Sequence, residues 1–485
     1  MAIRRGYELR TGPVTHARRE GATSAGPAAV VVAAGVVATA VATRSLCVPL
    51  VAAIVVGVAT RRLGVVVVVA VLGAAGVHRS DGAWHDLRPD RLGPFAGWVT
   101  VVDDPRRAGT ATNVLVEIDG ERFELWVRGR ARQLRARSWR GGDRIVVVGE
   151  RRLLDDARVA RVAWRHVVGE FIADWVGDAL EGDALARSSN RVRAVIERGA
   201  STLPADQAAL IRGLVIGDDR DESPEMVERF RASGLSHLTA VSGQNVAFVL
   251  AAAGPLLRRA PPFGRWALSI GLIAWFVVVT RAEPSVLRAG VMAGLSATAF
   301  VLGRPRQPVR LLALAVIGLL LVDPLLAWSV GFWLSVGATA GVTAIGPWLA
   351  PRFGALGPLA MPVAITVGAQ LGVALPSVLV FGRLSLVGTV ANLVAVPVAG
   401  FVMLYGLPAC LLAGAVPPIA SFVMAPAGMA VAWIDAVATV GAATEPGPPW
   451  SWLGWLAVAA VITGLVSVGR CRTRRQASPV SGHTI

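Results

Sequence analysis

The chain has 485 residues, of which 54% are hydrophobic, and its mean hydropathy is +0.58. Soluble domains average about 45–50% apolar residues, so this composition excludes an ordinary soluble enzyme and indicates a polytopic α-helical membrane protein. The formal net charge is +16, and every basic residue is arginine because the sequence contains no lysine. Arginine suits phosphate binding, although a chain without lysine that is rich in alanine, valine and glycine also indicates compositional bias.

Three apolar runs follow a basic N-terminus at residues 1–26. The runs at 27–43, 46–60 and 63–77 predict an N-terminal membrane region over 27–80, with three helices rather than a cleavable signal peptide. The arginines before the first run place the N-terminus in the cytoplasm by the positive-inside rule. The third helix then ends on the outer face of the membrane.

Residues 88–170 have the pattern of a small β domain. Runs rich in β-branched residues alternate with Asp-Asp-Pro, Asp-Gly and Gly-Gly-Asp turn signals. We therefore expect a small extracytoplasmic β-barrel or sandwich, for which an OB-like barrel is one of several small folds that fit.

A basic stretch without acids crosses this domain, and tryptophans lie near it. OB folds bind single-stranded nucleic acid by combining a cationic groove with aromatic stacking. The candidate contacts are Trp98, Trp126, Arg128, Arg130, Arg132 and Trp139. The alternative is a solvated basic loop that contacts lipid headgroups.

The remaining chain divides into an amphipathic helical linker at 171–234, a membrane block of about nine segments at 235–468 and a basic tail at 469–485. Arginine-rich loops at 258–265 and 304–310 alternate with the poorly basic turn at Asp323-Pro324, so we expect both loops and the tail in the cytoplasm. The total number of membrane segments is then even, near twelve. Residues 384–415 fit either one broken helix or two short ones.

Polar residues interrupt the membrane block in two places. Residues 234–248 read Gly-Leu-Ser-His-Leu-Thr-Ala-Val-Ser-Gly-Gln-Asn-Val-Ala-Phe, and 281–290 read Arg-Ala-Glu-Pro-Ser-Val-Leu-Arg-Ala-Gly. Polar groups at membrane depth must face protein or water, and a charge there costs at least ~2.5–3.5 kcal/mol unless it is paired or hydrated. The alternatives are helix capping for the first run and an ion pair of Arg288 with Glu283 or Asp323 for the second.

The run at 234–248 resembles the competence domain of the ComEC family, the DNA-uptake channels of transformable bacteria. That family usually shows Gly-Leu-Ser-His-Leu-Leu-Ala-Val-Ser-Gly-Leu-His-Val, so Gln244 and Asn245 replace Leu and His here. Residues 284–289 match the family's Pro-Ser-x-x-Arg-Ala element, and 323–324 match its Asp-Pro turn. Trp333 replaces the Gln of Gly-Phe-Gln-Leu-Ser, as a packing residue or a base-stacking one.

The resemblance implies an OB-like domain at 88–170 and a channel for single-stranded DNA through the cytoplasmic (inner) membrane. The basic ends of the chain place both termini in the cytoplasm. The implied partners are single-stranded DNA, membrane lipids, DNA-delivery and DNA-translocase competence proteins, and a separate nuclease. The DNA path would be lined by His237, Ser242, Gln244, Asn245, Arg281, Glu283, Arg288, Gln370 and Asn392.

We expect no cofactor, no metal and no catalytic activity. The six histidines are not at ligand spacing, the three cysteines are far apart, and no phosphate-binding Gly-x4-Gly-Lys-Ser/Thr loop exists. The C-terminal metallo-β-lactamase-like domain of many ComEC proteins is also expected to be missing. Two rival functions remain: a channel for another anionic substrate, and a membrane-embedded hydrolase using His237, Ser242 and Asp218 or Asp323.

Overall fold

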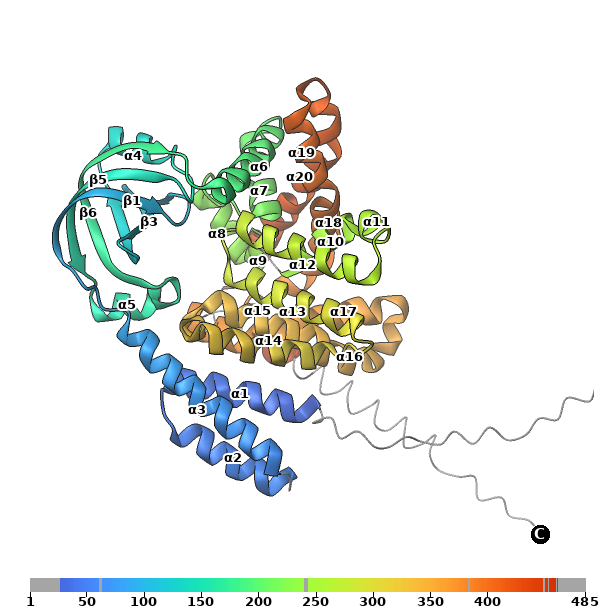
Figure 1. Cartoon of the computed structure of the whole chain (residues 1–485). Coiled ribbons are helices and arrows are strands. Elements are labelled where there is room, and N and C mark those ends of the chain that lie inside the picture. The colour runs from blue at the N-terminus through green and yellow to red at the C-terminus, as the bar shows by residue number, and fades with distance from the viewer. Residues whose placement is uncertain are drawn as a thin grey trace, which may run out of the picture.

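A sheet domain lies beside a block of helices, and three N-terminal helices pack along one side of that block (Figure 1). The computed structural model describes residues 27–60, 63–239, 243–382, 384–447, 450–451, 453–458 and 460. The predicted N-terminal segment 1–26, Ser242 and the predicted tail 469–485 lie outside the described residues.

The N-terminal helices coincide with the three predicted apolar runs. They are α1 (Pro27–Thr43), α2 (Cys47–Thr60) and α3 (Leu63–His85). α1 packs against α3 and against α14 (Pro308–Val322). The helix α3 continues past the predicted end at residue 77, and there Arg79 donates hydrogen bonds to the carbonyls of Leu321 and Val322. These bonds satisfy carbonyls that the last turn of α14 leaves free.

The sheet has six strands in the order β1-β5-β6-β4-β3-β2. The strands are β1 (Gly93–Val101), β2 (Arg106–Ala108), β3 (Ala111–Ile118), β4 (Glu121–Val127), β5 (Arg144–Leu153) and β6 (Val167–Leu180). β4 and β6 are parallel, and the other pairs are antiparallel. β1 also pairs with β3, so β1, β5, β6, β4 and β3 form a closed cycle of pairings.

Alternation along the strands places one set of side chains in a shared core. This core contains Val99, Phe123, Ile145 and Phe171, together with Trp139, which has no exposed surface. Trp139 follows α4 (Arg130–Ala136) and fills the interior, so its predicted role as a DNA contact is wrong.

The sheet continues past the predicted boundary at residue 170 to Leu180. The helical linker was predicted to begin at residue 171. The spacing of the apolar residues that follow also fits one face of a helix, as Phe171, Ile172, Trp175 and Val176 show. The segment pairs with β5, so it is a strand and not a helix.

Three helices follow the sheet, namely α6 (Ala184–Ala200), α7 (Ala205–Ile216) and α8 (Pro224–Ala232). Every residue of α7 from Ala208 to Ile216 is buried, and α7 shares one apolar core with α18 (Gly388–Phe401), α19 (Leu407–Ala415) and α20 (Ala420–Thr444). The predicted amphipathic linker therefore includes a helix, α7, that belongs to the helical core.

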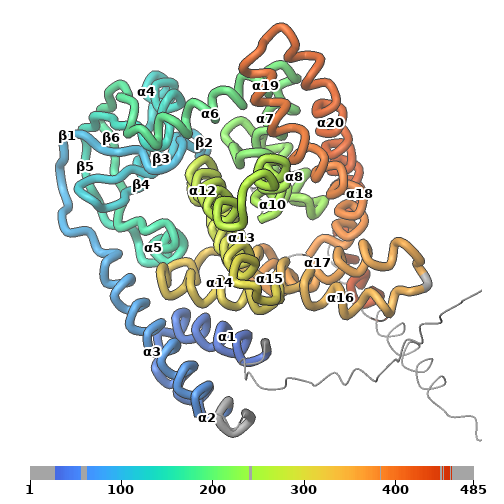
Figure 2. Tube along the Cα trace, turned by 45° about the vertical axis from the view of Figure 1, so that its right-hand side comes forward, coloured from blue at the N-terminus to red at the C-terminus, as the bar shows by residue number. Residues whose placement is uncertain are grey.

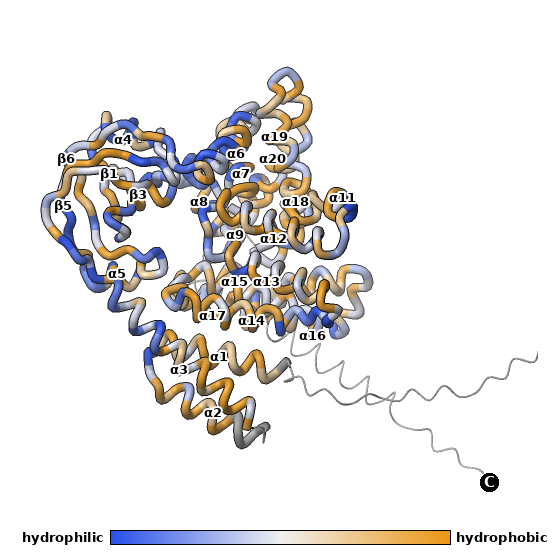
Figure 3. The backbone as a smooth tube through the Cα atoms, in the orientation of Figure 1, coloured by the Kyte–Doolittle hydropathy of each residue, from blue (hydrophilic) through white to orange (hydrophobic). Residues whose placement is uncertain are grey.

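The second block begins with α9 (Ser236–Thr239), α10 (Gly243–Ala252) and α11 (Gly254–Leu257). It continues with α12 (Pro262–Val279), α13 (Pro284–Val301), α14, α15 (Val330–Ala340), α16 (Gly346–Leu349), α17 (Ala360–Phe381) and α18 to α20. Across the described residues, seven helices are long and apolar enough to cross a membrane: Leu63–His85, Pro262–Val279, Pro284–Val301, Val330–Gly354, Leu356–Phe381, Gly388–Ala415 and Pro417–Thr444. Figure 3 shows hydrophobic residues along α2, α14 and α19 and hydrophilic ones along α6.

Residues 388–415 form one helix with a π-helical turn at Val402–Gly406. The turn directly precedes Pro408, which lacks an N–H and crowds the carbonyl one turn earlier, so a local widening relieves the conflict. The structure thus has the broken helix rather than two short ones.

Glycines bring α15 and α17 into backbone contact. A Cβ at Gly372 would lie 2.0 Å from the carbonyl oxygen of Gly337, so no larger residue fits there. Small residues give membrane helices this close approach. The contact fixes the position of α15, which carries Ser335.

Candidate functional site

Arg288 is the most unusual polar residue of the helical block. Pro284 begins α13, and Arg288 lies one turn further on with only 4% of its surface exposed. Its Nε donates to the Ser335 hydroxyl at 2.8 Å, and its Nη1 lies 3.0 Å from the sulfur of Met292. Among the described residues no carboxylate oxygen lies within 4.0 Å of the guanidinium. Arg288 is therefore a buried cation with only neutral partners in that part of the chain.

Both predicted ion-pair partners of Arg288 are engaged elsewhere. Glu283 contacts Arg106 of β2 at 3.3 Å, and Asp323 contacts His166 at 3.0 Å. The ion-pair interpretation of Arg288 is therefore wrong, because both acids turn towards the sheet domain.

The start of α10 lies directly against Arg288. A Cβ at Gly243 would be 2.6 Å from Nη2 of Arg288. The next residue, Gln244, is exposed, whereas Asn245 is buried and donates from Nδ2 to the carbonyl of Leu214 at 2.9 Å. Of the predicted path residues, the structure thus places Arg288 and the Gln-Asn pair at one location.

A second polar cluster surrounds the loop that precedes α18. Gln370 donates from Nε2 to the carbonyl of Ser385 at 3.0 Å, and Asn392 donates from Nδ2 to the carbonyl of Gly388 at 2.7 Å. Glu445 accepts a hydrogen bond from the Ser385 hydroxyl at 2.8 Å, together with two from backbone N–H groups of the loop. Gln370 and Glu445 therefore hold this loop, whereas the Asn392 bond lies within α18 itself, and the sequence interpretation missed Ser385 and Glu445.

The segment that carries His237 connects the two polar clusters. A Cβ at Gly234 would lie 3.0 Å from the Cα of Gly388, so the start of the 234–248 motif touches the loop before α18. His237 itself is exposed on α9. The motif therefore runs from the cluster around Ser385 to the cluster around Arg288.

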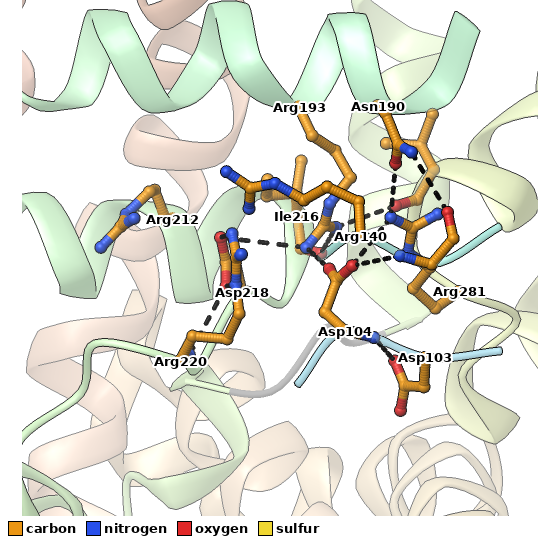
Figure 4. A network of polar contacts seen from close by, with 12 residues as sticks. Asp103, Asp104, Arg140, Asn190, Arg193, Arg212, Ile216, Asp218, Arg220 and Arg281 are labelled. Atoms are coloured by element: carbon orange, nitrogen blue, oxygen red, sulfur yellow. Dashed lines mark hydrogen bonds and ion pairs between the residues drawn. The ribbon is translucent and has the colours of Figure 1, made fainter. Parts of the chain in front are cut away.

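Arg281 belongs to a different place, the junction between the sheet domain and the helices (Figure 4). Its Nη2 lies 2.9 Å from Asp104 and 2.6 Å from the side-chain oxygen of Asn190 on α6. Arg193, also on α6, contacts Asp104 at 2.7 Å. Arg281 and its neighbour Glu283 were predicted to line the DNA path, but their side chains instead tie α12 and α13 to the sheet domain.

Electrostatics hold two junction acids, Asp104 and Asp218, in their ionised form. Burial alone would raise the pKa of Asp104, but Arg193 and Arg281 outweigh it and hold that pKa well below its usual range. Burial likewise opposes ionisation of Asp218, whereas its hydrogen bonds to Arg220 lower the pKa to about 2. These charges come from chain segments far apart in the sequence, and only their convergence in the fold identifies the junction.

The predicted contacts of the sheet domain differ in exposure. Trp98 is 47% exposed, with the Arg144 guanidinium 5.5 Å from its ring centre. Trp126 is half-buried beneath Arg158, which lies 5.1 Å from its ring. Arg128 and Arg130 are exposed.

The side chain of Arg132 contacts β6, where it donates to the carbonyls of Ala173 at 3.1 Å and Asp174 at 2.7 Å. In the helical block, Trp333 donates to the carbonyl of Ala327 at 2.8 Å and packs edge-on against Phe332, as expected for a packing residue. No group of three potential metal-ligating side chains occurs within the described part of the chain.

The Competence protein family model matches residues 214–474, more than half of the chain. The chain belongs to the Competence protein family. Its matched region begins inside α7 and includes both polar clusters, whereas the sheet domain precedes it. Since seven helices among the described residues are long and apolar enough to cross a membrane, this competence protein is a multi-pass membrane protein.

Two curated relatives match part of the chain. It is 29% identical over 207 residues to the uncharacterized protein YcaI of Escherichia coli K12, covering 40% of this chain and 28% of that protein. It is 29% identical over 210 residues to ComE operon protein 3 of Bacillus subtilis strain 168, covering 42% and 26% respectively. The chain thus aligns with little more than a quarter of the length of each relative. No solved structure gives a significant match.

Proposed function

We propose that this competence protein carries single-stranded DNA through the cytoplasmic membrane during natural transformation. The observation that supports this most is Arg288, a buried guanidinium without a described counter-charge, placed against the start of α10 in the family's matched region. A buried charge without a partner costs several kcal/mol, so it is retained where an anion arrives to neutralise it.

The chemistry around Arg288 fits a phosphodiester. A guanidinium forms charge-assisted and often bidentate hydrogen bonds with phosphate oxygens. Arg288 therefore offers a positively charged, hydrogen-bonding group to one phosphate. His237 and Gln244 are exposed nearby in the sequence and could contact sugars or bases along the path.

The proposed direction of transport follows from the ends of three consecutive helices. The Arg281–Glu283 corner between α12 and α13 contacts the sheet domain, and so does Asp323 after α14. The opposite ends of these helices meet the arginine-rich turns at 258–265 and 304–310. The positive-inside rule then places the sheet domain outside and these turns in the cytoplasm. DNA would meet the sheet domain first.

The sheet domain would act as an OB-like barrel that receives DNA. Support comes from the closed cycle of strand pairings with a parallel β4–β6 contact, and from the exposed Arg128 and Arg130. Membrane lipids surround the helices in this proposal. Delivery to the surface, energy for translocation and degradation of the other strand would come from partner proteins, and the polypeptide itself would have no catalytic role.

Labelled DNA uptake tests the proposal directly. A deletion strain should lose entry of labelled DNA into a nuclease-protected state, and the restored gene should return it. Unchanged uptake in the deletion strain would contradict the proposal. A channel for another anionic substrate is the second candidate, since Arg288 would accept any small anion. It would be favoured if the deletion strain takes up DNA normally but fails to transport another anion.

A further inference from the structure

The outer surface of β1, β5 and β6 carries an exposed aromatic patch. Trp98 on β1, Val148 on β5 and Trp175 on β6 are 47%, 39% and 49% exposed. Solvent-facing strand positions are normally polar, so large apolar side chains on three adjacent strands indicate a binding surface.

Strand register places the two tryptophans on either side of β5. Trp98 lies opposite Val146, and Trp175 lies opposite Val148, two residues further along the same strand. The backbone positions of the two tryptophans are thus separated by two strand spacings, roughly 10 Å across the sheet, with the valines between them. The two indoles can therefore contact different bases of one strand.

Arginines flank the patch on both sides. Arg144 lies over the Trp98 ring at 5.5 Å. On the other side, Arg132 and Arg135 of α4 reach along β6, and Arg135 donates to the carbonyl of Val176 at 2.9 Å, next to Trp175. Aromatic rings bordered by guanidinium groups are the combination that binds single-stranded nucleic acid, through base stacking and phosphate contacts.

The face formed by β3 and β4 is unsuitable for the same role. Arg158 of α5 (Asp156–Val162) lies over Trp126 and contacts Glu124 at 2.6 Å and Glu170 at 3.0 Å. Trp126 is therefore less exposed than Trp98 and Trp175, and the arginine over it is held by two carboxylates. Figures 1 and 2 both place β5 on the side of the sheet domain away from the helices, where incoming DNA meets no obstruction from the helical block.

We propose that Trp98 and Trp175 form a base-stacking platform for single-stranded DNA on the β1–β5–β6 surface. This inference rests on the proposed function and names where DNA first contacts the protein. The platform would bind without sequence preference, because every base has a face that stacks on indole.

Binding of a fluorescent oligothymidylate to the full-length protein in nanodiscs, followed by anisotropy, tests the platform. Trp98→Ala and Trp175→Ala should each weaken binding roughly 5-fold or more, and the double variant should weaken it further. Two controls should bind as the unmodified protein does: Leu153→Ala, an exposed apolar residue elsewhere on β5, and Trp433→Ala, an exposed tryptophan on α20. A duplex of equal length should bind more weakly than the single strand, since its bases are already stacked.

The outcomes separate the platform from the proposed function. If the unmodified protein binds the oligonucleotide and the double variant binds it equally well, the platform proposal is overturned, whereas the proposal of DNA transport still stands. If the double variant lowers DNA uptake by cells without weakening oligonucleotide binding, the patch docks a protein instead, which also overturns the platform. Absence of any binding by the unmodified protein would contradict both proposals.

Discussion

Arg193 and Asp104 form a buried ion pair in which Nη2 lies 2.7 Å from Oδ2. The two side chains are only 4% and 7% exposed, and they join α6 to the turn that follows β1. Arg281 contacts the other oxygen of the same carboxylate at 2.9 Å. One aspartate therefore holds two arginines, one from α6 and one from the turn between α12 and α13, and it fixes the sheet domain on the helical block.

Replacing this aspartate should loosen the junction. Asp104→Asn keeps the shape of the side chain but leaves Arg193 and Arg281 without their carboxylate, so we expect a loss of about 3–5 kcal/mol in the free energy of unfolding. A lower melting temperature of the detergent-purified protein would register this loss. Glu117→Gln, at an exposed position on β3, is the matched control and should melt as the unmodified protein does. Equal melting of the Asp104 variant would contradict the importance of the pair.

Arg288 should matter for DNA entry more than for folding. Arg288→Gln retains hydrogen bonding to Ser335 but removes the charge, so abundance in the membrane should stay nearly unchanged while uptake falls at least tenfold. Arg288→Lys keeps the charge without the bidentate geometry and should give an intermediate uptake. The control is Arg259→Gln, an exposed arginine. A collapse in abundance of the Gln variant would instead assign Arg288 a structural role.

Cysteine labelling should place the sheet domain outside the cytoplasm. In a background without native cysteines, Ala131→Cys on α4 should react with an impermeant maleimide in intact cells. Gln307→Cys, in the arginine-rich turn before α14, should react only after permeabilisation. Both positions are exposed, so accessibility of the side chain does not separate them. The reverse pattern would invert the proposed topology.

Glu222 should make stability depend on pH. Burial raises its pKa to about 8, with further contributions from Asp219 and Asp218, and its Oε1 has no hydrogen-bond partner among the described residues. The folded state thus retains a proton that the unfolded chain loses near its ordinary pKa of 4.5, so stability falls as pH rises from there towards 8. Glu222→Gln stays neutral, so its melting temperature relative to the unmodified protein should rise between pH 5 and pH 8. A difference independent of pH would contradict this account.

The sequence predicted those features that depend on local pattern. The bounds of α1 and the position of the sheet domain follow from apolar runs and turn signals, which act over a few residues. The end of β6 was misjudged because the spacing of Phe171 and Trp175 fits two periodicities, and pairing with β5 decides between them.

The candidate site could be predicted only in part, for a similar reason. Arg288 was conspicuous as a charge inside an apolar helix. Its lack of a described ion pair could not be predicted, because it follows from the contacts of Glu283 and Asp323 with the sheet domain. Arg193 lies in the segment 171–234, for which the sequence predicted only an amphipathic linker. Its burial follows from the approach of Asp104, which is 89 positions away in the chain.

The junction also implies an order of assembly. The sheet domain is complete at Leu180, whereas the residues that fasten it to the helices appear only later in synthesis, among them Asp323, which contacts His166 from 157 positions further on. Domains generally fold as units while the chain is still being made, with the N-terminal one first. The sheet domain should therefore fold as a tethered body beside the membrane. It would become fixed only when α12, α13 and α14 have been inserted.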